Sequence, residues 1–165
     1  MSRRAEKLRF SHPVFIGSLA IFILSLSSNA QTNELQPGTT TGSSNLDASR
    51  VFALGMIETG NDDRGVGRAG EISRYQIHPV VWKAYSKSRD YRNPEVSLEV
   101  ARQHWAVLSN YFKEKTAREP SNFDMYVLWN TRYGYYAGKG FDPQRLPRFM
   151  RDRAQRFVNL VNRRG

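Results

Sequence analysis

Three short segments of the chain carry the side chains best suited to chemistry. The first is Ile57-Glu58-Thr59-Gly60, in which a glutamate directly follows an apolar helical stripe. In that position we expect Glu58 to be half shielded from water, which raises the pKa of a carboxyl group and suits it to act as a general acid. The alternative is an ordinary surface glutamate in the last turn of a helix.

The second and third segments combine a polar amide with apolar or aromatic neighbours. In the stretch from Gly70 to Pro79, Gln76 lies between Tyr75 and Ile77. In the third segment, Leu128-Trp129-Asn130 is followed by Tyr133, Tyr135 and Tyr136. Aromatic rings beside an amide can stack on sugar rings and hydrogen-bond to them. The alternative for the second segment is a loop ordered by its own hydrogen bonds. The alternative for the third is that its aromatic residues simply fill the core.

Helices must position these segments, because apolar residues recur at helical spacing and no convincing alternating strand appears. Asp47 can cap a first helix that Gly60 ends, and a polar loop over residues 61–75, with a short hairpin as one reading, follows. Pro79 suits the first turn of a short helix. Asn93-Pro94-Glu95 starts a longer one with apolar residues at Leu98, Ala101, Trp105, Leu108 and Phe112.

Two further helices and a loop complete the pattern. Pro120-Ser121 opens a helix, and a loop rich in tyrosine and glycine then runs from Arg132 to Phe141. The last helix begins near Pro147. Its expected apolar face consists of Phe149, Met150, Ala154, Phe157, Val158 and Val161, with arginines on the other face. We therefore expect a mainly α fold with at most one small β element.

Residues 1–30 have the pattern of a cleavable secretory signal. Arg3, Arg4, Lys7 and Arg9 precede an apolar run that ends at Ser28-Asn29-Ala30, so cleavage is expected before Gln31. An uncleaved membrane anchor is the alternative, although the run is short for a span of about 20 residues. Residues 31–46 are polar and read as a flexible linker. One small domain over residues 47–165 remains, and we expect it in the periplasm or outside the cell, with membrane contact only during export.

Charge and composition indicate what kind of partner and cofactor to expect. The chain carries a net +10, and removing four bases and one acid with the signal leaves +7, which suits an anionic polymer. The arginines are dispersed, which disfavours nucleic acid as a partner. There is no cysteine, and the three histidines show no ligand spacing, so neither a metal nor a cofactor is expected.

In this order, the three segments resemble the lysozyme-like family of soluble lytic transglycosylases and goose-type lysozymes. That family has a helix ending in Glu-Ser, a Gly-Leu-Met/Phe-Gln stretch leading to Ile-x-Pro, and an Ala-Tyr-Asn stretch on a later helix. The corresponding segments here are Glu58-Thr59, Ser73-Arg74-Tyr75-Gln76 with Ile77 and Pro79, and Leu128-Trp129-Asn130. The resemblance covers about residues 50 to 140. It implies a lysozyme-like fold, α+β with a minimal β element, in a single small domain.

The resemblance also implies an activity. Glu58 would be the catalytic acid and then the base in cleaving the β-1,4 bond between N-acetylmuramic acid and N-acetylglucosamine in peptidoglycan, giving 1,6-anhydromuramoyl ends. Gln76 and Asn130 would bind substrate amides. Tyr75, Trp129 and Tyr133 would line the cleft, and Thr59 and Ser73 would complete the substrate-binding set. We expect a monomer whose partner is the glycan strand itself.

The segments also depart from the family pattern. Ser73 replaces a glycine, and Arg74 puts a charge where the family has an apolar residue. Trp129 replaces a tyrosine whose hydroxyl is thought to touch the catalytic acid in relatives, and Tyr133 or Tyr135 is the expected substitute. Two alternatives stay open: a hydrolytic lysozyme in which Asp62 or Asp63 positions water, and a wall-binding domain without turnover.

Overall fold

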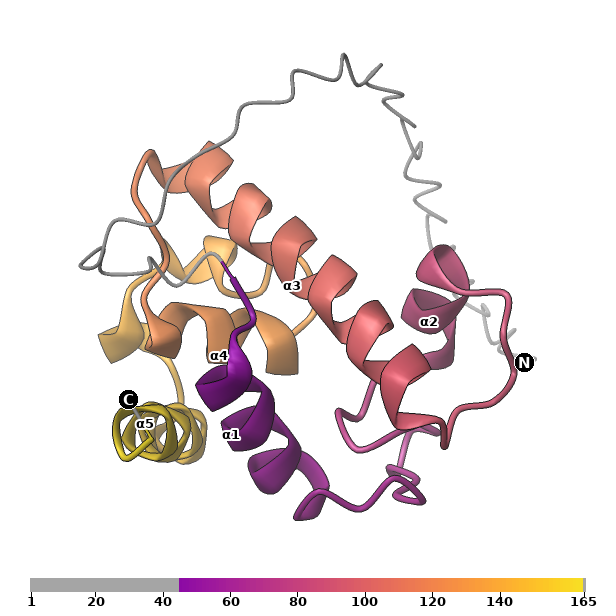
Figure 1. Cartoon of the computed structure of the whole chain (residues 1–165). Coiled ribbons are helices and arrows are strands. Elements are labelled where there is room, and N and C mark those ends of the chain that lie inside the picture. Colours follow the sequence, from indigo (N-terminus) through magenta and orange to yellow (C-terminus); the bar gives the residue numbers. More distant parts are fainter. Residues whose placement is uncertain (1–44, 165) are drawn as a thin grey trace, which may run out of the picture. The chain divides into compact units, whose positions relative to one another are not determined.

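The computed structural model describes residues 45–164, and these residues are mainly helical, as the sequence predicts. The signal and nearly all of the linker expected over residues 1–46 lie outside this range. Within it, no helix is long and apolar enough to cross a membrane. Residues 45–164 form five α-helices and two 3-10 helices, which are α1 (Ala48–Thr59), α2 (Pro79–Tyr85), α3 (Pro94–Thr116), α4 (Asn122–Asn130), η1 (Ala137–Lys139), η2 (Pro143–Arg145) and α5 (Arg148–Asn162) (Figure 1).

Side-chain caps fix where the helices begin and end. Asp47 accepts a hydrogen bond from the Arg50 amide at 2.9 Å at the start of α1, and Gly60 ends this helix in a left-handed conformation, with φ 71°. Asn93 caps α3 ahead of Pro94, and Ser121 forms a reciprocal capping box with the third residue of α4. The predicted starts of these helices are therefore confirmed.

The β element is smaller than a hairpin of two strands. Ile72 and Ile77 form one isolated antiparallel bridge through two hydrogen bonds of 2.9 Å, and residues 45–164 contain no longer strand. The bridge closes a turn in which Ser73 and Gln76 both have positive φ, at 64° and 51°. It therefore bends the segment that carries Gln76 back on itself.

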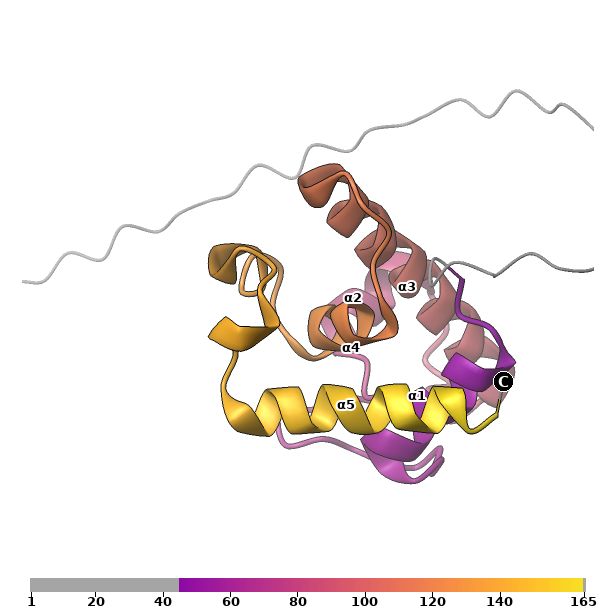
Figure 2. The same cartoon turned by 90° about the vertical axis from the view of Figure 1, so that its left-hand side faces the viewer.

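The core lies around α4, which packs against both α3 and α5 (Figures 1 and 2). Four consecutive residues of α4, from Met125 to Leu128, are buried. α3 contributes Trp105, Leu108 and Phe112, and α5 contributes Phe157, whose ring stacks on that of Tyr126 with centroids 5.1 Å apart. α5 also packs against α1, so the C-terminal helix contacts both helices that carry the site described below.

One prediction for α5 is wrong. Ala154, Phe157 and Val161 are buried as expected, but Phe149 is 72% exposed. At about 3.6 residues per turn, Phe149 falls well outside the stripe that these three residues form. Its side chain therefore points away from the helices against which α5 packs.

A buried carboxylate joins α4 to the segments before and after it. Asp124 Oδ2 accepts hydrogen bonds from the Arg118 guanidinium at 3.0 Å and from the Ser121 amide and hydroxyl at 2.9 and 2.7 Å. Its Oδ1 accepts the Tyr136 hydroxyl at 2.8 Å. Burial alone would raise the pKa of Asp124, but these hydrogen bonds outweigh burial and hold it below its ordinary value. Tyr136 thereby has a structural partner and is fully buried.

Candidate active site

A cleft of about 920 Å³ lies where the end of α1, the following loop, the middle of α3 and the end of α4 meet. Arg153 of α5 also reaches it. Five predicted site residues line this cleft together: Glu58, Gln76, Trp129, Asn130 and Tyr133. Its other lining residues include charged groups (Arg68, Glu71, Arg132 and Arg153), two histidines (His78 and His104) and apolar groups (Val66, Ile77, Val80, Val81 and Leu108).

Glu58 is held by three hydrogen-bond donors. Its Oε1 accepts the Tyr126 hydroxyl at 2.9 Å and the Asn130 side-chain amide at 2.8 Å. Its Oε2 accepts the Arg153 guanidinium at 3.0 Å. The Glu58 side chain is only 6% exposed, so the carboxyl is more shielded than the sequence predicts. A carboxyl group with both oxygens fixed in this way is well oriented toward a ligand in the cleft.

Tyr126 is the tyrosine that reaches Glu58. Its hydroxyl donates to Glu58 and accepts from the Arg153 Nε at 2.6 Å. Burial and the neighbouring Glu58 carboxylate raise the pKa of Tyr126, so its hydroxyl remains a protonated donor. Tyr126 and Asn130 are four residues apart on α4 and therefore share a helix face, which explains why both meet the same carboxylate oxygen.

The expectation that Tyr133 or Tyr135 supplies this hydroxyl is wrong. Tyr133 packs edge-on against Tyr111 at 5.6 Å, and burial, followed by the nearby Tyr85 and Tyr111, raises its pKa to about 12. Tyr135 lies in the exposed loop, with the Lys139 ammonium 5.8 Å from its ring centre. Both follow α4 in a loop, whereas Tyr126 is inside the helix and its hydroxyl contacts Glu58.

Trp129 has a positioning role that its motif does not reveal. Its indole Nε1 donates to the Tyr75 carbonyl at 3.1 Å, which ties the end of α4 to the segment that carries Gln76. The Gln76 amide donates to the Gly65 and Ser73 carbonyls, both at 3.3 Å. Gln76 is thus held in the cleft wall by its own loop.

Three predicted site residues do not line the cleft. Tyr75 is 2% exposed and belongs to the core, so its expected role as a cleft residue is wrong. Ser73 is also buried, and its hydroxyl accepts the Tyr75 amide at 3.3 Å. The Thr59 hydroxyl donates to the Arg74 carbonyl at 3.0 Å and accepts the Asp62 amide at 3.1 Å. These side chains shape the turn around Gln76 instead of facing a ligand.

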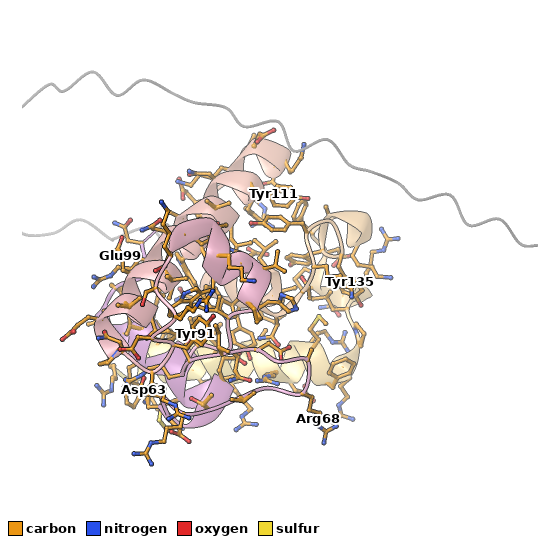
Figure 3. All side chains as sticks on the ribbon, turned by 90° about the vertical axis from the view of Figure 1, so that its right-hand side faces the viewer. Asp63, Arg68, Tyr91, Glu99, Tyr111 and Tyr135 are labelled. Atoms are coloured by element: carbon orange, nitrogen blue, oxygen red, sulfur yellow. The ribbon has the colours of Figure 1, made fainter. Side chains whose placement is uncertain are left out.

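The two aspartates considered as water-positioning groups also lie outside the cleft lining. Asp63 forms a two-pronged ion pair with Arg74, and the Asp62 side chain accepts the Arg64 amide at 2.9 Å. Figure 3 shows Asp63 and Arg68, from the loop between α1 and α2, on opposite sides of the view. The carboxyl group that does line the cleft besides Glu58 is Glu71, whose Oε2 accepts the Ala69 amide at 3.0 Å. Its own local turn thus orients Glu71.

His104 forms part of the cleft wall on α3. It is 8% exposed, its Nδ1 lies 3.4 Å from the Tyr85 hydroxyl, and its ring packs near that of Trp129 at 5.2 Å. Burial lowers the pKa of His104 to about 4, so the imidazole is neutral near pH 7. In the sequence, His104 belongs to none of the three segments and is marked only by its apolar neighbours.

The stability of the protein should therefore fall as the pH drops from about 6.5 to about 4. Because the pKa of His104 is lower in the folded protein than its ordinary 6.5, the unfolded chain binds more protons across this window. The shift corresponds to about 3 kcal/mol of unfolding free energy, present above pH 6.5 and lost toward pH 4. Urea denaturation at several pH values measures this, and the unfolding free energy of His104→Gln should depend less on pH than that of the wild type.

His78→Asn is the matched control, because His78 is exposed and an asparagine can still cap α2. This variant should keep the wild-type pH dependence. If the unfolding free energy of His104→Gln changes with pH as steeply as that of the wild type, other groups cause the loss of stability in acid.

Neither a metal centre nor a relative identifies the site. Residues 45–164 contain no group of three or more histidine, cysteine, aspartate or glutamate side chains that could hold a metal ion. Comparisons of the chain with protein-family models, with curated proteins and with solved structures find no match. The function has to be inferred from the cleft and the side chains in it.

Proposed function

We propose that the protein is a lytic transglycosylase that cleaves the β-1,4 bond between N-acetylmuramic acid and N-acetylglucosamine in peptidoglycan. One observation carries the proposal: the side chain of Glu58, only 6% exposed, is oriented by Tyr126, Asn130 and Arg153 at the wall of an open cleft. The same cleft presents Trp129 and Tyr133, which suit a sugar ring, and Gln76, which suits an acetamido group.

In this proposal Glu58 acts twice. As general acid it gives its proton to the oxygen that leaves when the bond to the muramoyl C1 breaks. As carboxylate it then takes the proton of the muramoyl C6 hydroxyl, whose oxygen forms the new bond to C1. Glu58 thus regains the proton that it gave away, and the product is a 1,6-anhydro ring. The tethered hydroxyl benefits from a high effective concentration, so no second carboxylate is needed.

The expected setting of the protein agrees with such a substrate. An exported chain with a net charge of +7 after signal removal would be attracted to an anionic wall polymer. Arg68 and Arg132 are exposed and line the cleft, which brings part of that positive charge to the site. The partner we propose is therefore the glycan strand of peptidoglycan.

A hydrolytic lysozyme remains the second candidate, and Glu71 is the observation that favours it. An inverting hydrolase needs a second carboxylate about 6.5–9.5 Å from the acid to activate water. Asp62 and Asp63 are engaged elsewhere, whereas Glu71 lines the same cleft as Glu58. In this candidate Glu71 would be the base, and Glu58 would act as acid alone.

Product analysis separates these two reactions. We expect mass spectrometry of digested peptidoglycan to show fragments lighter by one water, with anhydro ends, because the C6 hydroxyl replaces water as the attacking group. Glu71→Gln should retain most of the activity, and so should the control Asp62→Asn, which lies outside the cleft lining. Free reducing ends, together with loss of turnover in Glu71→Gln alone, would establish the hydrolase instead.

A further inference from the structure

Gly67 lies at a point of the cleft wall where no side chain fits. It belongs to the loop between α1 and α2, next to Arg68 (Figure 3), and it lines the cleft together with Glu71 and Gln76. A Cβ atom at this position would lie less than 3.0 Å from Glu71 Oε2, Glu71 Cδ and Gln76 Oε1, closer than Cβ atoms approach other heavy atoms in proteins. The missing side chain therefore leaves the space beside which these two polar groups lie.

Space, and not backbone conformation, explains the glycine at position 67. Four other glycines among residues 45–164 have positive φ, whereas Gly67 has a backbone conformation that other residues also adopt. Its position is fixed by a turn, because its amide donates to the Glu71 carbonyl at 2.8 Å and its carbonyl accepts the Gly70 amide at 3.1 Å. This turn resists movement of the backbone, so a methyl group at position 67 would displace the Glu71 and Gln76 side chains instead.

The direction of the Gln76 side chain depends on this space. Its amide nitrogen donates to the Gly65 and Ser73 carbonyls, both at 3.3 Å, so the oxygen of the same amide is turned toward Gly67. Two carbonyl partners can be met only by the nitrogen, which fixes the orientation of the amide. No donor of residues 45–164 bonds to Gln76 Oε1, and this oxygen is not buried. It is thus an open acceptor on the cleft wall, and the groups that it can bind are N–H and O–H donors.

We propose that Gly67 is a positioning residue for Gln76, because its missing side chain lets Gln76 Oε1 face the cleft and accept a hydrogen bond from an N–H or O–H group of the ligand. A methyl group at position 67 would displace this oxygen but leave the contacts of Glu58 in place, since the three partners of Glu58 lie on α4 and α5. The nature of the ligand rests on the proposed function, in which the donor is an acetamido N–H or a hydroxyl group of the glycan.

The test compares crystal structures of the wild type, Gly67→Ala and Gly138→Ala. Gly138 is the matched control, because its φ is not positive either and a Cβ atom there would meet nothing within 4 Å beyond its neighbours in the chain. Both substitutions restrict the unfolded chain in the same way, so the variants differ in their folded contacts. We expect Gln76 Oε1 to move by about 1 Å or more in Gly67→Ala, to reach an ordinary contact distance, and to stay in place in Gly138→Ala. An unmoved Gln76 side chain in Gly67→Ala would overturn the proposal.

Ligand binding provides a second readout, with a tetrasaccharide of alternating N-acetylglucosamine and N-acetylmuramic acid as the probe. Measured in the Glu58→Gln background to prevent cleavage, its dissociation constant should rise by about 3- to 10-fold with Gly67→Ala, the effect of one lost hydrogen bond, and not with Gly138→Ala. With Glu58 intact, Gly67→Ala should raise the KM of cleavage more than it lowers kcat. An unchanged dissociation constant would overturn the role of Gln76 Oε1 as the acceptor for the ligand.

The two readouts separate this proposal from the proposed function. A tetrasaccharide that does not bind even without Gly67→Ala would contradict the proposed function, whereas displacement of Gln76 in the crystal would still establish the positioning role of Gly67. If Gly67→Ala does not fold, the same substitution in a Glu71→Ala background avoids two of the three close contacts. The position of Gln76 Oε1 is then compared with that in Glu71→Ala alone, and an unmoved oxygen would again overturn the proposal.

Discussion

Glu58→Gln should lower the rate of peptidoglycan cleavage by about 10² to 10⁴-fold, the range that a positioned acid–base group contributes. Glutamine has the size of glutamate but can neither give a proton to the leaving oxygen nor take one from the C6 hydroxyl. Its amide oxygen can still accept from Tyr126 and Asn130, and the partly exposed Arg153 can be hydrated. We therefore expect the melting temperature to stay close to that of the wild type. Zymography on purified sacculi and thermal unfolding measure the two effects.

Glu99→Gln is the control, because Glu99 is an exposed residue on α3 away from the cleft lining (Figure 3). It should leave both activity and stability unchanged. Unchanged cleavage by Glu58→Gln would remove Glu58 from the mechanism. A wild-type protein that binds sacculi without cleaving them would instead favour a wall-binding domain that has lost turnover.

The helices were predictable because their ends carry strong local signals. Asp47, Asn93 and Ser121 each satisfy amides at a helix start, and Gly60 adopts the left-handed conformation that ends α1. Such signals involve residues within one turn of each other, so they can be read from the sequence without knowledge of tertiary contacts. The same locality explains why Glu58, at the end of the first helix, stood out.

The partners of Glu58 were harder to find because they are distant in sequence. Tyr126 is 68 residues and Arg153 is 95 residues from Glu58. The four-residue spacing of Tyr126 and Asn130 was an available signal, since Asn130 was already selected and both lie on one helix face. Arg153 offered none, because arginines outside the apolar stripe of a helix are normally solvent-facing side chains.

The predicted cleft residues were also correct only in part. Gln76 and Trp129 line the cleft, but Tyr75, the residue before Gln76 in the chain, is buried. Ser73 and Gln76 have positive φ, so the side chains of this turn do not follow the repeat of a helix or a strand. Which of them face the cleft and which face the core therefore cannot be predicted from their spacing. The residue types therefore identified the segment around Gln76 as part of the cleft wall. The direction of each side chain in that segment depends on the conformation of the turn.

A large effect on stability at pH 7 is expected from substitution of Asp124, which also holds in place the helix that carries Tyr126 and Asn130. Its two oxygens accept four hydrogen bonds, from Arg118, from the Ser121 amide and hydroxyl, and from Tyr136. An asparagine can present only one oxygen. If that oxygen keeps the three donors on Oδ2, the amide nitrogen faces the Tyr136 hydroxyl, whose proton then has no acceptor. Burial of Tyr136 and its bond to Asp124 raise its pKa, so the hydroxyl cannot relieve the mismatch by ionising.

Asp124→Asn should therefore lower the unfolding free energy by about 2 to 3 kcal/mol, the cost of losing charged hydrogen bonds in a buried site. Urea denaturation at pH 7 measures it, with Asp152→Asn as the control, since Asp152 is exposed and its pair with Arg148, at 3.5 Å, should contribute little. The sign of the pH dependence follows from the pKa of Asp124, which hydrogen bonds hold below its ordinary 3.8 despite burial. The contribution of Asp124 is present above that value and lost as the pH falls through the lower, folded pKa. The wild type and Asp124→Asn should accordingly converge in strong acid, and a loss at pH 7 no larger than that of Asp152→Asn would show that the Asp124 hydrogen bonds do not hold α4 in place.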